Sequence, residues 1–140
     1  METGFDEQNG QFSPDGNWIA LESNESGRSE VYVRPFPRRG EQLQISHAGG
    51  AQARWREDGR ELFYIALDGQ LMAVPIEITS DRALQAGTPS SLFPTRVGGA
   101  IRSNQRQTYI VSEDGQRFLM NTLSVEAPPP LAVILNWTPP

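Results

Sequence analysis

A repeated segment constrains the fold of this chain more than any other feature of its sequence. Three ten-residue stretches align without gaps: FSPDGNWIAL at 12–21, WREDGRELFY at 55–64 and VSEDGQRFLM at 111–120. Each begins with a bulky apolar residue, passes through an Asp-Gly pair and ends in an apolar run. Asp-Gly is typical of a tight turn, because the Asp side chain accepts hydrogen bonds from the turn and Gly takes the positive φ. The sequence therefore predicts three equivalent β-hairpins.

More strands follow each hairpin. We expect a third strand at 30–36, 70–76 and 131–137, and a fourth at 41–46 and 90–94. Short apolar runs bounded by turn residues are typical of strands covered on both faces. Residues 79–90 could hold at most a helical turn, because Gly87 and Pro89 interrupt them. The predicted class is all-β, because four antiparallel strands in each repeat indicate β-propeller blades.

The repeat predicts one array of blades over residues 1–140, with blades at 9–46, 51–94 and 106–137. The last blade lacks room for a fourth strand, since only three residues follow Trp137. The segment from Met1 to Gln8 precedes the first blade and is spare.

Three blades make half of a six-bladed ring. Propellers protect their edges by closing, typically with four to eight blades, and an open ring leaves an apolar flank at each end. Because twofold dimers are the commonest soluble oligomers, we expect a homodimer of 3+3 blades, in which the spare N-terminal segment of one chain completes the last blade of the other. The alternative is that the sequence is a piece of a larger propeller.

Composition excludes several classes of function. The net charge of −5 opposes binding to nucleic acid, and we interpret the basic cluster Arg34, Arg38 and Arg39 as a solvated loop. The absence of cysteine excludes disulfides, thiol catalysis and cysteine metal sites. No segment is apolar enough for membrane insertion, and the N-terminus does not read as a signal peptide. We expect a soluble protein.

Candidate site residues lie where chain segments approach the expected axis. His47 is the only histidine and follows the fourth strand of the first blade, so it could be a metal ligand or general base, or a surface loop residue. Gln52, Arg54, Arg102 and Asn104 are expected to line a polar channel, where arginine favours carboxylates and other anions. The alternative for each of these four is a hydrogen bond between blades.

Catalytic motifs are absent from the sequence. There is no Gly-x-Ser-x-Gly motif and no phosphate-binding glycine loop. Ser46 precedes His47 without an obvious orienting acid, and the acidic turns are explained by turn formation. No cofactor is predicted. A divalent metal could be held by His47 and Asn104 with Asp6 or Glu7, but no motif indicates it.

The string FSPDGNWIALESNESGRSEVYVRPFP resembles the repeat of TolB-type and WD-like bacterial β-propeller proteins, whose blades carry a Ser-Pro-Asp-Gly hairpin. The end of the chain is similar to closing blades at the C-termini of bacterial multidomain proteins, some of which carry a kinase domain. The resemblance implies a propeller of six or seven blades, of which this chain has three. It also implies an extracytoplasmic location as one option, as part of a larger protein, and leaves the compartment open.

The resemblance does not imply an activity, since propellers host many unrelated functions. Our leading hypothesis is a ligand- or protein-binding module or scaffold, without catalysis. The alternative is a small promiscuous hydrolase of esters or phosphoesters, with a channel site that uses His47 or a metal.

Overall fold

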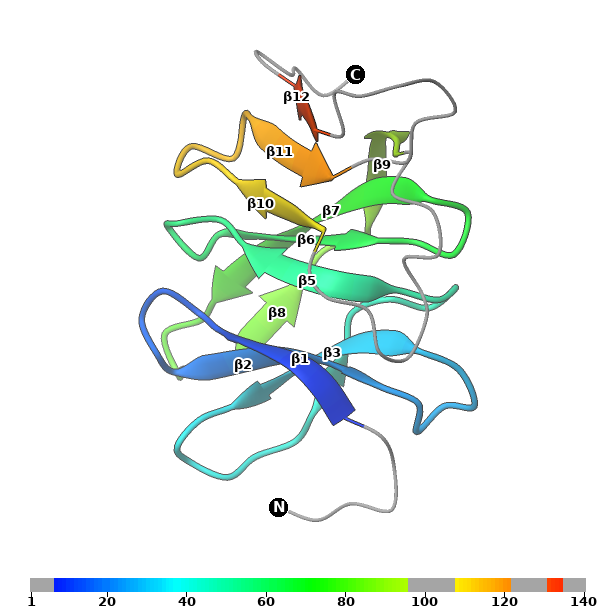
Figure 1. Ribbon diagram of the computed structural model, residues 1–140. Helices are drawn as coiled ribbons and strands as arrows, with labels where there is room; N and C mark the ends of the chain where they lie inside the picture. The colour runs from blue at the N-terminus through cyan, green and yellow to red at the C-terminus, as the bar shows by residue number, and fades with distance from the viewer. Residues whose placement is uncertain (1–6, 96–107, 122–130, 135–140) are drawn as a thin grey trace.

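The computed structural model describes residues 7–95 and 108–121, and the backbone of 131–134. The regular secondary structure of these residues consists of β-strands alone. The strands form three antiparallel sheets that are stacked in chain order (Figure 1). The all-β prediction is confirmed. Within the described ranges, no helix is present that could cross a membrane.

Each sheet is one blade. Neighbouring strands follow the order of the sequence, except that the fifth strand of blade two pairs with the third. Blade one contains β1 (Glu7–Phe12), β2 (Trp18–Ser23), β3 (Glu30–Pro35) and β4 (Leu43–Gln44). Blade two contains β5 (Ala51–Trp55), β6 (Glu61–Ile65), β7 (Gln70–Ile78), β8 (Leu84–Ala86) and β9 (Ser90–Pro94). The described part of blade three contains β10 (Tyr109–Val111), β11 (Phe118–Asn121) and β12 (Leu131–Ile134). The residues that follow Ile134 lie outside the described part.

The hairpins form as the repeat predicts. In the first hairpin, the N–H of Gly16 donates to the carbonyl of Ser13 at 2.9 Å, and the Ser13 hydroxyl donates to Asp15 at 2.6 Å. The third hairpin repeats both contacts: its glycine N–H donates to the carbonyl of Ser112, and the Ser112 hydroxyl donates to Asp114 at 2.5 Å. The glycine takes the positive φ that the turn requires, at 75° for Gly16. Local chemistry therefore fixes these turns.

β1 begins earlier than the sequence predicts. The sequence predicts that the segment from Met1 to Gln8 is spare, but Glu7 and Gln8 belong to β1. The register shifts between Gln8 and Gln11, where Asn9 has a φ of 54°. Neither the repeat nor an apolar run in the sequence marks this bulge, so the start of β1 could not be predicted from them.

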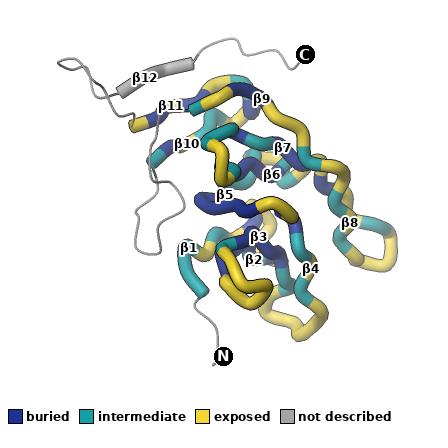
Figure 2. The backbone as a smooth tube through the Cα atoms, turned by 90° about the vertical axis from the view of Figure 1, so that its right-hand side faces the viewer, coloured by how far each residue is buried: buried dark blue, intermediate teal, exposed yellow. Residues whose placement is uncertain are grey.

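Residues 79–90 form part of a β-hairpin instead of a helical turn. The end of β7 pairs with β8, and the N–H of Thr79 donates to the carbonyl of Ala83 at 2.8 Å. The hairpin projects beyond the sheets (Figure 2), and its Arg82 carbonyl accepts a hydrogen bond from Arg38 of blade one at 2.6 Å. The segment is short and mostly polar, so its strand could not be recognised without the pairing partner.

Apolar side chains fill the two spaces between the blades. Neighbouring residues of β6 belong to different clusters: Leu62 packs against blade one and Phe63 packs against blade three. Both are fully buried. The middle sheet is thus covered on both faces (Figure 2), as the short apolar runs predict.

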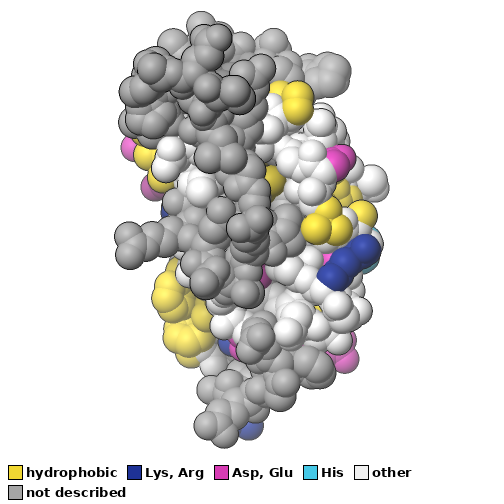
Figure 3. Space-filling view, turned by 45° about the vertical axis from the view of Figure 1, so that its right-hand side comes forward, with side chains coloured by type: hydrophobic (Ala, Val, Ile, Leu, Met, Phe, Trp, Pro, Cys, Tyr) yellow, Lys and Arg dark blue, Asp and Glu magenta, His cyan; other side chains and the backbone are white. Residues whose placement is uncertain are grey.

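Some large apolar side chains remain at the surface instead. Figure 3 shows apolar side chains gathered in separate patches on the face that it presents. The exposed large apolar residues in the described part are Phe12, Phe36, Leu43, Leu67, Ile78, Ile110 and Leu119.

The turn carboxylates predict a loss of stability in acid. The Ser13 hydroxyl, followed by the backbone N–H of Asn17, lowers the pKa of Asp15 below its ordinary value of 3.8. Hydrogen bonds from Ser112 and then from the backbone lower the pKa of Asp114 in the same way. A carboxyl group with a lowered pKa stabilises the fold above its unfolded pKa, and this contribution is lost as the pH falls through the folded pKa. We expect the urea concentration at the midpoint of unfolding to decrease when the pH is lowered below about 4.

A double variant isolates the contribution of the turns. Ser13→Ala with Ser112→Ala removes both hydroxyl donors, so its urea midpoint should depend less on pH in this range than that of the unaltered chain. Burial raises the pKa of Glu61, so this residue makes stability change with pH in the opposite direction. Because both proteins contain Glu61, its contribution cancels in the comparison. An identical acid dependence in the two proteins would contradict the prediction.

Candidate functional site

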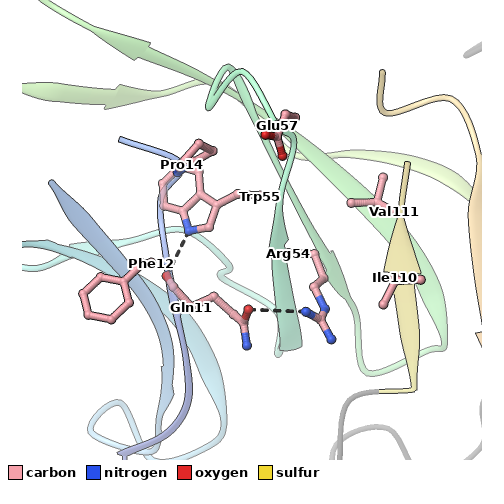
Figure 4. A pocket seen from close by; sticks show the side chains of 8 residues that line it. All are labelled: Gln11, Phe12, Pro14, Arg54, Trp55, Glu57, Ile110 and Val111. Atoms are coloured by element: carbon pink, nitrogen blue, oxygen red, sulfur yellow. Dashed lines mark hydrogen bonds between the residues drawn. The ribbon is translucent and has the colours of Figure 1, made fainter. Parts of the chain in front are cut away.

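A cleft opens where the first strands of the three blades meet. Its volume is about 370 Å³ (Figure 4). The repeat relates its walls: Gln11, Arg54 and Ile110 occupy equivalent positions two residues before each turn begins. The residues that line the cleft come from β1, β5, β10 and the turns after β1 and β5: Gln11, Phe12, Pro14, Arg54, Trp55, Glu57, Ile110 and Val111. All three repeats therefore contribute to one site.

Arg54 supplies positive charge to this cleft. Its Nη1 donates to Oε1 of Gln11 at 3.3 Å, a long and therefore weak hydrogen bond (Figure 4). Its Nε is buried and has no hydrogen-bond partner among the residues that the structure describes. A buried N–H without an acceptor costs about 1–3 kcal/mol, so an acceptor supplied by a ligand would stabilise the folded chain. A carboxylate matches this group best, because it can accept two parallel N–H bonds.

Apart from Arg54, Gln11 and Glu57, the side chains of the lining are apolar. Phe12 and Ile110 are 59% and 52% exposed, and they border the cleft on opposite sides of Arg54 (Figure 4). Trp55 is half-buried, and its indole N–H donates to the backbone carbonyl of Gln11 at 3.0 Å, which fixes the ring against β1. Glu57 is exposed on the turn and is the acidic residue of the lining. The site thus combines one cation and one acidic side chain with mainly apolar side chains.

Gln52 connects the three blades instead of facing the cleft. It is fully buried, and its backbone N–H donates to Oε1 of Glu22 in blade one at 2.7 Å. Its side-chain Oε1 accepts from both the N–H and the hydroxyl of Thr108, each at 2.7 Å. The Tyr109 hydroxyl donates to its backbone carbonyl at 2.7 Å. These bonds match the alternative interpretation of Gln52, and they hold β5, and with it Arg54, between its neighbours.

Glu22 is a central residue that the sequence did not reveal. Its carboxylate is buried and accepts hydrogen bonds from Gln8 at 3.2 Å, from Asn9 at 2.8 Å and from the N–H of Gln52. Asn9 and Gln52 are equivalent in the repeat, and both have a positive φ, of 54° and 58°. A single acidic residue at the end of an apolar run gave no signal of this role.

His47 lies in a different cleft from Arg54. It is exposed, and the second cleft, of about 310 Å³, is bordered by Ser26, Gly27, Arg28, Glu30, Gln44 and His47. The two clefts share no residue among those described. The backbone carbonyl of His47 accepts a hydrogen bond from Arg28 at 2.7 Å, so this linker is tied to the β2–β3 turn.

Ser46, which precedes His47, is fully buried and fully engaged. Its hydroxyl donates to the carboxylate of Glu30 in a short hydrogen bond and accepts the N–H of Val31 at 2.8 Å. Glu30 also accepts from the N–H of Gly49 at 2.9 Å. This network joins β3 to the linker that leads into blade two. The Ser46 hydroxyl is therefore occupied by structural bonds.

Arg102 and Asn104, the other two predicted channel residues, lie outside the described residues, as does Asp6. Among the residues that are described, no group of three or more histidine or carboxylate side chains is placed to hold a metal ion. The predicted metal option is therefore untested. In the basic cluster, Arg34 pairs with Glu7 at 3.3 Å and Arg38 stacks on Trp18.

Solved structures with low sequence identity to this chain support the fold. No family model and no curated protein sequence matches this chain. Among solved structures, TolB from Acinetobacter baumannii is similar over 88% of this chain and 28% of its own, with a TM-score of 0.59 and 17% identity. The chain has a TolB-like β-propeller fold. An oligogalacturonate lyase from Vibrio parahaemolyticus is similar over 78% of this chain and 26% of its own, with a TM-score of 0.50 and 16% identity.

The chain spans less than a third of the length of either propeller. At these identities the likeness concerns the arrangement of the strands and carries no information about ligands. The TolB-like blades nevertheless explain why the three first strands meet at one cleft, since propeller sheets are arranged radially around a central channel.

Proposed function

We propose that this chain is a ligand-binding propeller module that holds the carboxylate of an acidic ligand against Arg54. The observation that carries the proposal is the buried Nε of Arg54, which has no acceptor within the described part of the chain and lies in the lining of the cleft. A carboxylate would accept from Nε and from one terminal nitrogen at once, which makes the recognition bidentate.

The apolar walls favour a ligand with an apolar body. A cleft of about 370 Å³ falls within the size range of small-molecule sites, which are mostly apolar with a few placed polar groups. Pro14, Trp55 and Val111 offer such a surface beside the cation. We therefore propose an organic carboxylate with an aromatic or aliphatic body, either free or at the end of a peptide.

The structure supports ligand binding better than it supports an esterase in which Ser46 and His47 would act as nucleophile and base. The Ser46 hydroxyl already bonds to Glu30 and Val31, and His47 is exposed in a cleft that does not contain Arg54.

The fluorescence of Trp55 gives a direct test, because the indole ring lines the cleft. Titration with 2-naphthoate should change tryptophan emission with saturation, and 2-naphthamide, which has the same body without the charge, should bind at least about tenfold more weakly. Arg54→Met should lose a similar factor for naphthoate, because the methionine keeps the apolar stem but has no guanidinium.

His47→Ala is the matched control, since it alters the other cleft and should bind naphthoate as the unaltered chain does. Equal binding of naphthoate and naphthamide, or full binding by Arg54→Met, would contradict the proposed carboxylate site. Loss of binding in His47→Ala alone would move the site to the second cleft.

A further inference from the structure

Blades one and three each have an outer face whose equivalent in the other blades is packed against a neighbouring blade. Ala20, Phe63 and Leu119 are equivalent in the repeat and point toward the following blade. Ala20 and Phe63 are fully buried, whereas Leu119 is 37% exposed. Ile110 lies opposite Leu119 in the register of β10 and β11, and it is 52% exposed. The outer face of blade three is therefore an interblade surface that no blade in the described part of the chain covers.

The outer face of blade one is the complementary surface. Ile19, Leu62 and Phe118 are equivalent and point toward the preceding blade; Leu62 and Phe118 are fully buried, but Ile19 is only half-buried. Beside Ile19, Phe12 packs edge-on against Phe36 at 5.0 Å between ring centroids, and the two are 59% and 42% exposed. This face lacks a preceding blade in the described chain.

We propose that a second copy of this chain covers both faces and closes a six-bladed ring. Blade three of each copy would pack on blade one of the other, so the contact that the chain makes twice within itself is repeated at two further places. A twofold axis produces both contacts at once, which is the commonest symmetry of soluble oligomers.

The internal interface indicates which residues would meet. Phe63 of blade two packs edge-on against Phe118 of blade three, with ring centroids 5.1 Å apart. Leu119 is the equivalent of Phe63, and Ile19 is the equivalent of Phe118. Leu119 of one copy would therefore lie against Ile19 of the second copy. Two apolar side chains in these positions match the chemistry of the internal contact.

Ring closure also completes the cleft at the first strands. In one copy, β1, β5 and β10 supply half of the inner wall, including one Arg54. The second copy would supply the other half and a second Arg54 across the axis. The dimer thus has a channel with two equivalent cation sites, although dimer formation does not depend on the carboxylate proposal.

Cross-linking tests the proposed contact directly, because the chain contains no cysteine. Ile19→Cys and Leu119→Cys are placed in one chain and treated with a bismaleimide that spans the roughly 10 Å between packed sheets. We expect a covalent dimer and nothing larger, because each closed ring contains both contacts. Either cysteine alone should give no covalent dimer, since the two copies of one position lie at different interfaces.

Sedimentation of the unaltered chain should give twice the chain mass of 15.5 kDa. Leu119→Glu should reduce it to the mass of one chain. The matched control is Leu67→Glu: Leu67 is 51% exposed but lies after β6 in blade two, which has a blade on both sides, so this variant should remain a dimer.

Three outcomes would overturn the proposal. A monomeric unaltered chain would mean that other blades, from a longer polypeptide, cover the faces. A ladder of cross-linked species would indicate an open head-to-tail chain instead of a ring. If the Leu119→Glu variant is still a dimer and the cysteine pair gives no cross-link, the interface lies elsewhere. If Leu119→Glu fails to fold, the cysteine pair still decides, because cysteine at these positions is small and apolar.

Discussion

Phe118→Ala should lower the free energy of unfolding by about 3–5 kcal/mol. Phe118 is fully buried, and its ring packs edge-on against Phe63 at 5.1 Å and against Phe93 at 5.6 Å. Truncation removes the transfer free energy of the ring and leaves a cavity between two sheets, which the hydrogen-bonded strands cannot close. Such aromatic pairs add about 0.5–1.5 kcal/mol beyond the buried area.

Urea unfolding followed by far-UV circular dichroism measures this loss, at one fixed protein concentration because an oligomer makes stability depend on concentration. Ile78→Ala is the matched control: this β7 side chain is 44% exposed, and its truncation should cost less than about 1 kcal/mol. A loss for Phe118→Ala no greater than that of the control would contradict the described packing of blade three on blade two.

Glu22→Ala should lower the free energy of unfolding by about 3 kcal/mol, because hydrogen bonds to a charged group contribute about 1.5–3 kcal/mol each and are not additive. The carboxylate is 3% exposed and accepts from Gln8, Asn9 and the N–H of Gln52. Its removal leaves the N–H of Gln52 buried without its acceptor. Since Gln52 also bonds to Thr108, the loss should reach the contact with blade three.

Amide exchange gives a second measure of the same variant, because the N–H of Gln52 should lose protection when its acceptor is removed. Glu25→Ala is the matched control. Glu25 is exposed and accepts one hydrogen bond from Gln42 at 2.7 Å, so its removal should change stability by less than about 0.5 kcal/mol. Equal effects of the two substitutions would show that Glu22 does not join blades one and two.

Residue roles could be predicted where they depend on sequence neighbours. Asp15 and Gly16 lie in a turn whose hydrogen bonds close within a few residues, so the Asp-Gly pair predicted it correctly. The repeat places Arg54 on a first strand, and the structure places it in the lining of the cleft, while its role in binding a ligand stays a prediction. In both cases the period of the repeat carried the necessary information.

Roles that depend on distant partners could not be predicted. Gln52 bonds to residues 30 and 56 positions away, so only the approach of the three blades decides whether it faces a ligand or a neighbouring strand. The separation of His47 from Arg54 has the same origin. His47 lies in the linker just before blade two and Arg54 lies on its first strand, but the backbone carbonyl of His47 bonds to the distant Arg28.

The sequence alone determined the hairpins, their repetition and the two-faced apolar strands, because turn preference and the alternation of side chains are local properties of the backbone. The tertiary structure alone decided that Glu22 and Gln52 join the blades and that β8 pairs with β7. It also decided that the buried Nε of Arg54 meets no acceptor among the described residues. These outcomes depend on which groups meet across blades, and a hydrogen bond or its absence is fixed only when both partners have been brought together.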